Sequence, residues 1–151
     1  MNFKIIAAID NKWGIGFNNI LPWKLPNEMK HFQRITKSVV DTNKTNAVIM
    51  GKNTLDSMNG IPLKNRRNIV ITRSDLSSLS IDCVPSLDIA LKNLKNISNI
   101  ENVFVIGGQQ LYEEAINDSR ALREPGKHCG TVGDAFVTGD GDFGGNAFEF
   151  L

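Results

Sequence analysis

The stretch that decides the fold is NVFVIGGQQLY, residues 102–112. Its first part, residues 102–106, is a short apolar run of the kind found in a strand buried on both faces. Gly107 and Gly108 then permit a tight turn, and Leu111 and Tyr112 follow at helical spacing. A buried strand that runs directly into a helix is typical of an α/β fold.

The same alternation of strand and helix recurs through the first 116 residues. Apolar runs predict strands at residues 3–9, 47–50, 68–72, 81–84 and 102–106. Helices are predicted to begin near Asn27, after Gly51, at Ser86 and after Gly108. Residues 41–46 are predicted to be a polar linker, and 59–67 a turn-rich loop. We therefore expect a mostly parallel central sheet with flanking helices.

Length and composition predict one soluble domain, residues 1–151. A chain of 151 residues buries one ordinary core, and its net charge of +1 gives no reason to expect nucleic-acid binding. The apolar run at residues 3–9 is too short for a secretion signal or a membrane span, so we expect a cytoplasmic protein without a membrane partner. Cys83 and Cys129 lack metal-ligand spacing, so we expect two thiols and no metal.

The composition changes abruptly after Ile116. Isoleucine occurs 16 times up to that residue and not afterwards, and seven of the 13 glycines lie within 126–145. Only residues 134–138 resemble a strand there, and 139–146 are too rich in glycine for a regular element. We therefore treat 117–151 as a divergent tail.

Two strand-to-helix junctions share a design suited to phosphate. Residues 50–54, MGKNT, and 106–110, IGGQQ, each end a strand with glycine and begin a helix. Free N–H groups and the helix dipole favour an anion there, and Lys52 adds a charge. Arg73, after the strand at 68–72, can take the extra phosphate that distinguishes NADP from NAD. Tight turns and a solvated arginine are the alternatives, because neither junction has the full dinucleotide fingerprint.

Three further charged side chains are candidates for substrate chemistry. Arg66 and Arg67 can hold a substrate carboxylate or form a solvated charge pair. Glu28 follows Trp23 and two prolines at the start of a predicted helix, which would place one carboxylate in an apolar pocket. Such a carboxylate has a raised pKa and can help deliver a proton. A glutamate that only complements the helix dipole is the alternative.

Taken together, these motifs resemble the dihydrofolate reductase family in order and spacing. The resemblance covers residues 3–116 and rests on IAA at 6–8, WGIG at 13–16, LPWKLPNE at 21–28, VIMGKNT at 48–54, RRNIVITR at 66–73 and VIGGQQLY at 105–112. It implies NADPH-dependent reduction of 7,8-dihydrofolate to 5,6,7,8-tetrahydrofolate, by hydride transfer to C6 and protonation of N5.

The resemblance also implies a role for each matching residue. Glu28 would bind the pterin and promote protonation, Trp23 would position an ordered water, and Thr138 would hydrogen-bond Glu28. The pterin and nicotinamide pocket would be lined by Ile6, Ala8, Phe32 and Ile106. Arg66 would bind the α-carboxylate of the glutamate tail, and Met58 and Leu63 would pack on the benzoyl ring. The cofactor would be held by Ala8, Ile15, Gly16, Gly51, Lys52, Asn53, Thr54, Thr72, Arg73, Gly107, Gly108, Gln109 and Gln110.

The likeness weakens after Ile116, and this keeps alternatives open. Residues 136–138 resemble the next family strand, and 146–150 weakly echo the segment after it. The family then continues for a final antiparallel hairpin, whereas this sequence stops at Leu151, so we expect this hairpin to be lacking. One alternative is a catalytically impaired remnant that binds NADPH or folate, or acts as an assembly partner. Another is the pyrimidine reductase of riboflavin synthesis, against which residues 21–28 argue. Dihydrofolate is the expected partner, and fusion or association with thymidylate synthase stays open.

Overall fold

The computed structural model of the chain describes residues 2–9, 26–76, 80–121, 130–132, 135–137 and 147–150. In chain order the elements are β1 (Lys4–Ile9), α1 (Pro26–Lys37), β2 (Thr45–Gly51), α2 (Lys52–Ser57), β3 (Arg67–Ile71), β4 (Asp82–Val84), α3 (Leu87–Lys95), β5 (Ile100–Gly107), α4 (Gln109–Ile116), β6 (Gly130–Val132), β7 (Ala135–Val137) and β8 (Ala147–Phe150). Within the described residues, no helix has the length and apolar character needed to cross a membrane.

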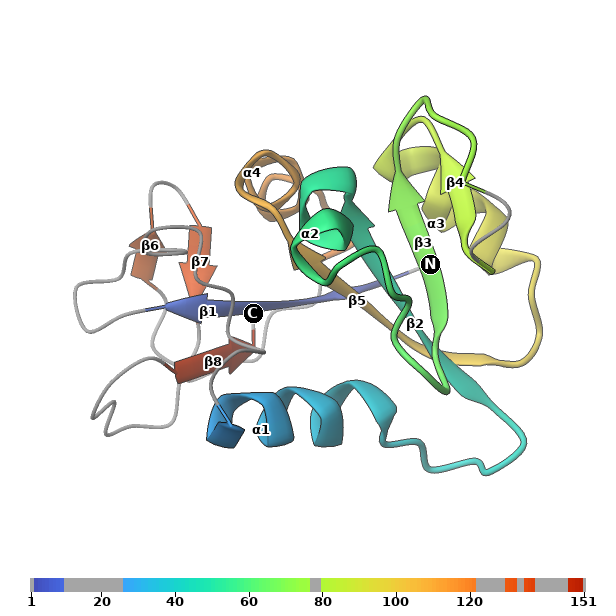
Figure 1. Cartoon of the computed structure of the whole chain (residues 1–151), viewed down its shortest axis with the longest axis horizontal. Helices are drawn as coiled ribbons and strands as arrows, with labels where there is room; N and C mark the ends of the chain where they lie inside the picture. Colours follow the sequence, from blue (N-terminus) through green and yellow to red (C-terminus); the bar gives the residue numbers. More distant parts are fainter. Residues whose placement is uncertain are drawn as a thin grey trace.

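The centre of the molecule is a six-stranded sheet in the order β4-β3-β2-β5-β1-β8 (Figure 1). All neighbouring strands are parallel except β8, which is antiparallel to β1. The central strands are apolar along their length, and Ala47 to Met50 of β2 are fully buried. This pattern is expected for parallel strands covered on both faces. The predicted α/β fold with a mostly parallel sheet is therefore confirmed.

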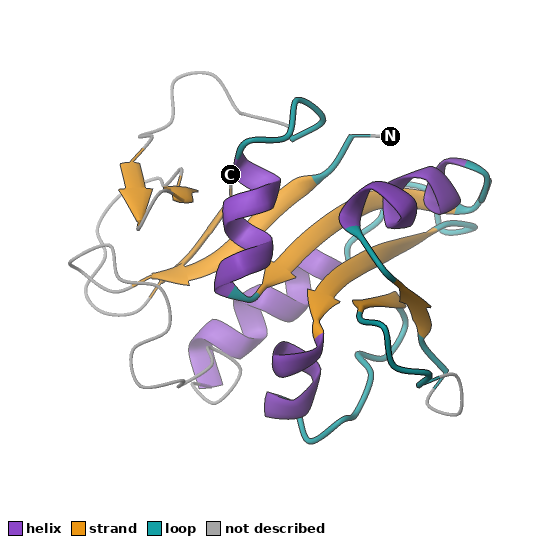
Figure 2. Cartoon of the chain, turned by 90° about the horizontal axis from the view of Figure 1, so that it is seen from above, coloured by secondary structure: helices purple, strands orange, loops and turns teal. Residues whose placement is uncertain are grey.

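Helices cover both faces of the sheet. Figure 2 shows α3 and α4 on the near face and α1 behind the sheet. Successive residues of a strand point to opposite faces, so the strands contribute to two apolar clusters. Ile49 and Val105 join the cluster beneath α3 and α4, whereas Val48 and Phe104 join the cluster that contains Phe32 of α1.

Most predicted elements are confirmed, with shifted boundaries. The predicted N-cap, Asn27, lies inside α1, because the helix already begins at Pro26. Proline suits a first helical position, where its fixed φ fits and its missing N–H is not needed. The predicted linker at 41–46 is wrong at its end, because β2 begins at Thr45. Thr45 donates its N–H to the carbonyl of Asn99 at 2.8 Å and is held in register with β5.

The tail contains more strand than its composition predicts. The predicted strand at 134–138 corresponds to β7, but β6 and β8 correct the expectation that no other strand forms there. β6 pairs antiparallel with β7, and β8 pairs with β1 from Ile6 to Ile9. The pairing of β8 depends on a partner at the other end of the chain, which local composition does not report. The glycine-rich residues 139–146 lie outside the described residues.

A carboxylate from β5 holds the connection between α1 and β2. Glu101 accepts the N–H of Val40 on both oxygens, at 3.0 and 2.8 Å, and the N–H of Asp41 at 2.8 Å. These backbone hydrogen bonds, the one from Asp41 first, lower the pKa of Glu101 below its ordinary value. The charged form of Glu101 therefore stabilises the fold.

We predict that Glu101→Gln destabilises the protein at neutral pH and that the difference from wild type shrinks in acid. Because the folded-state pKa is lowered, the contribution of the carboxylate is complete above the unfolded-state pKa of about 4.3 and is lost as the pH falls through the folded-state value. Urea unfolding of both proteins between pH 7 and pH 3 measures this. A difference that stays constant over that range would contradict the prediction.

Candidate active site

The two glycine junctions predicted separately from the sequence lie side by side. They close β2 and β5, which are neighbouring parallel strands, with Met50 in register with Gly107. A Cβ built on Gly51 would lie 3.8 Å from the amide nitrogen of Gly108. Because parallel strands end at the same edge of the sheet, both turns expose their backbone to one place. This edge is where open α/β sheets bind ligands.

Gly107 has a backbone conformation in which a residue with a side chain would be strained. Its φ is +132°, and a Cβ there would lie 3.2 Å from the hydroxyl oxygens of both Thr54 and Tyr112. The peptide bond between Gly107 and Gly108 is cis. A Cβ on Gly108 would lie 3.7 Å from Thr54 Oγ1. The absence of side chains therefore leaves a backbone surface that a phosphate or a nucleotide ring can approach closely.

Tyr112 of α4 links the strands β1 and β5 near this edge through its hydroxyl group. Its hydroxyl lies 2.9 Å from the carbonyl oxygen of Ile6 and 2.7 Å from that of Ile106. The hydroxyl has one proton for these two acceptors, which belong to β1 and β5. Burial raises the pKa of Tyr112, so the hydroxyl stays protonated and able to donate.

The polar candidates for cofactor binding surround the glycine junctions. Lys52 pairs with Asp56 at 3.1 Å, and both side chains are about half exposed, so the lysine is available to solvent. Asn53 and Gln110 are exposed, and Thr54 is buried. Gln109 is the first residue of α4, whose N-cap, Gly108, supplies no side-chain cap. The first N–H groups of this helix are therefore left to another acceptor.

The segment after β3 carries the remaining candidates. Thr72 donates its N–H to the carbonyl of Val84 at 2.9 Å and accepts the N–H of Ser74 on its hydroxyl at 3.1 Å. Arg73 is exposed, and its side chain has no ion-pair partner among the described residues. This exposure suits both interpretations of Arg73, the binding of an extra phosphate and a solvated charge.

Five of the predicted substrate residues belong to one apolar cluster, on the α1 side of the sheet. Ile6, Phe32 and Ile106 are buried in this cluster, and Met58 and Leu63 pack against it. These residues come from β1, α1, β5 and the loop after α2, so only the tertiary structure brings them together. The backbone of Ala8 lies in β1 beside them.

Arg66 is buried, and it contacts the helix that contributes Phe32 to this cluster. Its side chain donates from Nε to the carbonyl of Lys64 at 2.9 Å and from Nη1 to Thr36 Oγ1 at 2.8 Å. Burial lowers the pKa of Arg66 to about 10, so the guanidinium is still charged at neutral pH. No carboxylate among the described residues pairs with it. Burying an unpaired cation of this kind lowers the stability of the folded protein, and a bound ligand that carries an anionic group would offset this cost.

Arg66 and Arg67 do not form a solvated pair. Arg67 is exposed, and its Nε pairs with Asp82 of β4 at 2.6 Å. The solvated-pair interpretation is therefore wrong for Arg66 and fits only Arg67. The physical reason is that adjacent residues entering a strand point to opposite faces.

Thr36 and Tyr112 had no predicted role in this site. Thr36 donates its hydroxyl to the carbonyl of Phe32 at 2.8 Å while it accepts from Arg66. One signal was present for Thr36, because it shares the apolar stripe of α1 with Phe32 and a buried hydroxyl needs a partner. One acceptor of Tyr112, Ile106, lies six residues earlier on β5, but the other, Ile6, lies on β1, and no local signal identifies it.

Several predicted site residues are not tested by the structure. Glu28 is the third residue of α1 and thus lies in its first turn, but the structure does not describe its side chain. The side chains of Ala8 and Gln109 are not described either. Ile15, Gly16, Trp23 and Thr138 lie outside the described residues altogether.

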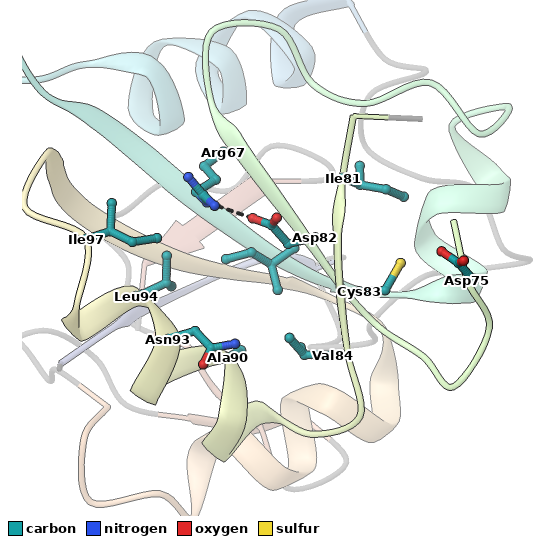
Figure 3. Close-up of a pocket in the computed structure, with 11 residues that line it drawn as sticks. Arg67, Asp75, Ile81, Asp82, Cys83, Val84, Ala90, Asn93, Leu94 and Ile97 are labelled. Carbon is teal, nitrogen blue, oxygen red and sulfur yellow. Dashed lines mark hydrogen bonds and ion pairs between the residues drawn. The ribbon is translucent and has the colours of Figure 1, made fainter. Parts of the chain in front are cut away.

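A separate cavity lies on the other side of the sheet, between α3 and strands β3 and β4 (Figure 3). Its volume is about 350 Å³, and its lining includes Ile69, Leu94 and the Arg67–Asp82 ion pair. Arg67 and Asp82 begin their strands, whereas Gly51 and Gly107 end theirs. The cavity is therefore near the opposite end of the sheet from the glycine junctions.

A parallel sheet with glycine turns at the carboxyl ends of neighbouring strands defines a nucleotide-binding α/β protein. The sequence model of the family "Dihydrofolate reductase" matches residues 2–141. A dihydrofolate reductase from Drosophila melanogaster is 37% identical over 129 residues, which cover 82% of this chain and 70% of that protein. A solved dihydrofolate reductase from Schistosoma mansoni superimposes with a TM-score of 0.69 at 36% identity, covering 80% of this chain and 70% of that one.

The chain belongs to the dihydrofolate reductase family. The family's reaction is the reduction of dihydrofolate, and NADPH is its cofactor. A bifunctional dihydrofolate reductase-thymidylate synthase from Glycine max is 37% identical over 124 residues, which cover 76% of this chain and 23% of that protein. These matches do not favour the pyrimidine reductase or the impaired remnant.

We predict that Gly107→Ala weakens both folding and NADPH binding. The new methyl group would lie 3.2 Å from two hydroxyl oxygens in a positive-φ conformation, a strain of about 1–3 kcal/mol. Gly51→Ala is the matched comparison, since its Cβ would have only ordinary contacts at 3.8 and 3.9 Å. Thermal melts should show a much larger decrease in melting temperature for Gly107→Ala than for Gly51→Ala. An equal decrease for the two variants would contradict this prediction.

Proposed function

We propose that this chain reduces 7,8-dihydrofolate to tetrahydrofolate with NADPH, in a site that runs from the edge where β2 and β5 end, along the face of the sheet beneath α1, to Arg66 just before the start of β3. The observation that carries the proposal is the buried guanidinium of Arg66, which lacks a carboxylate partner among the described residues and donates to Thr36, one helical turn after Phe32 of the apolar cluster. An elongated substrate with an aromatic body and a terminal carboxylate matches both features.

The glycine junctions fit the cofactor. Gly107 and Gly108 supply a backbone surface that a Cβ would obstruct, beside the hydroxyl of Thr54. In the proposal, Gly51, Gly107 and Gly108 approach the dinucleotide, while Lys52, Thr72 and Arg73 contact its phosphates. NADPH, when bound, supplies the hydride.

Arg66 anchors the substrate tail. Its Nε and one hydrogen of Nη1 are already engaged by Lys64 and Thr36, and in the proposal the remaining hydrogens on Nη1 and Nη2 donate to the carboxylate. This planar pair of donors matches the two carboxylate oxygens. Met58 and Leu63 then pack on the benzoyl ring, and Ile6, Phe32 and Ile106 exclude water from the pterin.

Glu28 binds the pterin and promotes protonation of N5 in this proposal. Its place in the first turn of α1 puts it on the helix that also carries Phe32 and Thr36. One helix would thus present the pterin-binding carboxylate, an apolar wall and the partner of Arg66. Trp23 and Thr138 are proposed as its supporting residues by the family likeness.

We predict that Arg66→Leu raises KM for dihydrofolate by about 10- to 100-fold, because a charge-assisted bidentate contact is lost. The value of kcat should change much less. Arg67→Leu is the matched control, since it removes the adjacent arginine from an exposed ion pair of little energetic value. Steady-state kinetics measure both variants. Equal effects of the two substitutions would show that Arg66 is not the anchor.

We predict that Glu28→Gln lowers kcat at pH 7 by about 100-fold or more, as expected when a proton-delivering group is removed. NADPH affinity, measured by fluorescence titration, should be unchanged. Glu114→Gln is the control, because it removes an exposed carboxylate from α4. Tight NADPH binding by the wild-type chain without any turnover of dihydrofolate would instead support the impaired remnant.

We also propose a cytoplasmic location and no nucleic-acid partner. The free thiol of Cys83 suits a reducing compartment. Association with a thymidylate synthase is supported only by the bifunctional relatives. Subcellular fractionation and co-purification from the source cells test these proposals, and a secreted protein would contradict the first.

A further inference from the structure

The loop that carries Leu63 and Arg66 is held from beneath by one buried side chain, Asn68 of β3. Its Oδ1 accepts the N–H of Leu63 at 2.9 Å, and its Nδ2 donates to the carbonyls of Leu63 at 2.8 Å and Arg66 at 2.9 Å. Asn68 is 4% exposed. The amide thus uses both of its donor hydrogens and its acceptor on the backbone of this loop.

The loop itself has little regular structure to fix its path. It lies between α2 and β3, and Asn59 and Asn65 have positive φ values of 59° and 62°. The hydrogen bonds of Asn68 therefore take the place of the backbone hydrogen bonds that a strand would form with its neighbour. They fix the main chain at Leu63 and at Arg66, the two loop residues proposed to contact the substrate tail.

A second buried asparagine holds the opposite wall of the same site. Asn46 of β2 donates to the carbonyls of Thr36 and Ser38, both at 2.9 Å, and accepts the N–H of Asn102 at 3.1 Å. These bonds fix the end of α1, where Thr36 accepts from Arg66. The guanidinium is thus held between a helix end and a loop that are each fixed to the sheet by an amide.

We propose that Asn68 is a positioning residue that sets the affinity of this site for the substrate tail. The inference rests on the proposed function, because the tail is that of dihydrofolate. Asn68 acts through the backbone of Leu63 and Arg66, which lie at the tail end of the proposed site. Its effect should therefore appear only with substrates that carry the benzoyl-glutamate tail.

The test compares two substrates in Asn68→Ala and Asn68→Asp, namely dihydrofolate and 6-methyl-7,8-dihydropterin, which lacks the tail. An aspartate can still accept from Leu63 but cannot donate to the two carbonyls. Both variants should raise KM for dihydrofolate by about tenfold or more, the effect of about one lost hydrogen bond to a charged group. KM for the tailless substrate, KM for NADPH and kcat should stay near wild type.

Leu91→Ala serves as the stability control, since it opens a cavity beneath α3 on the other face of the sheet. It should lower the melting temperature without changing the ratio of the two KM values. An unchanged ratio in both Asn68 variants, or a parallel rise of KM for both substrates, would overturn the proposal. A wild-type chain that turns over neither substrate would instead refute the proposed function.

Hydrogen exchange on the wild-type chain tests the same idea if the variants do not fold. The amide of Leu63 should be strongly protected in the free protein, because Asn68 already accepts it, and folate should add little protection. Fast exchange of this amide that becomes slow only with folate bound would mean that the ligand, and not Asn68, fixes the loop. That result would also overturn the proposal.

Discussion

The structure depends on the parallel pairing of β2 with β5. This pairing aligns Met50 with Gly107 and so places two glycine turns at one edge of the sheet. Each turn alone is an ordinary connection between a strand and a helix. Side by side, they leave a stretch of backbone without side chains, bordered by Thr54 and Tyr112. A dinucleotide site therefore follows from the register of two strands more than from any single residue.

The proposed substrate end of the site depends on a buried charge and on the residues that support it. Arg66 loses much of its hydration, and burial lowers its pKa, but Thr36 and Lys64 satisfy only part of its donors. The guanidinium edge that they leave open is fixed in direction by its two hydrogen bonds. Asn46 and Asn68 in turn fix the helix end and the loop that carry those acceptors. Such preorganisation reduces the entropy lost when a flexible substrate tail binds.

The two faces of the sheet differ in the residues that cover them and in their proposed roles. The face beneath α3 and α4 is packed with aliphatic residues and includes the Arg67–Asp82 ion pair only at its margin. The face beneath α1 combines an apolar cluster with Arg66 and, by the family likeness, Glu28. Alternation along the strands assigns residues to these faces, which is why neighbouring Arg66 and Arg67 have unrelated surroundings.

The sequence by itself determined the order of strands and helices up to Ile116, the glycine junctions and the family, because these depend on local periodicity and on motifs at fixed spacing. It also supplied Arg66 and the apolar residues proposed to bind substrate, although only as members of a matching pattern. The tertiary structure alone decided that Arg66 is buried while Arg67 is exposed, that Asn46 lies in a strand, and that β8 pairs with β1. These features depend on hydrogen-bond partners far away in the chain, and local sequence does not report such partners.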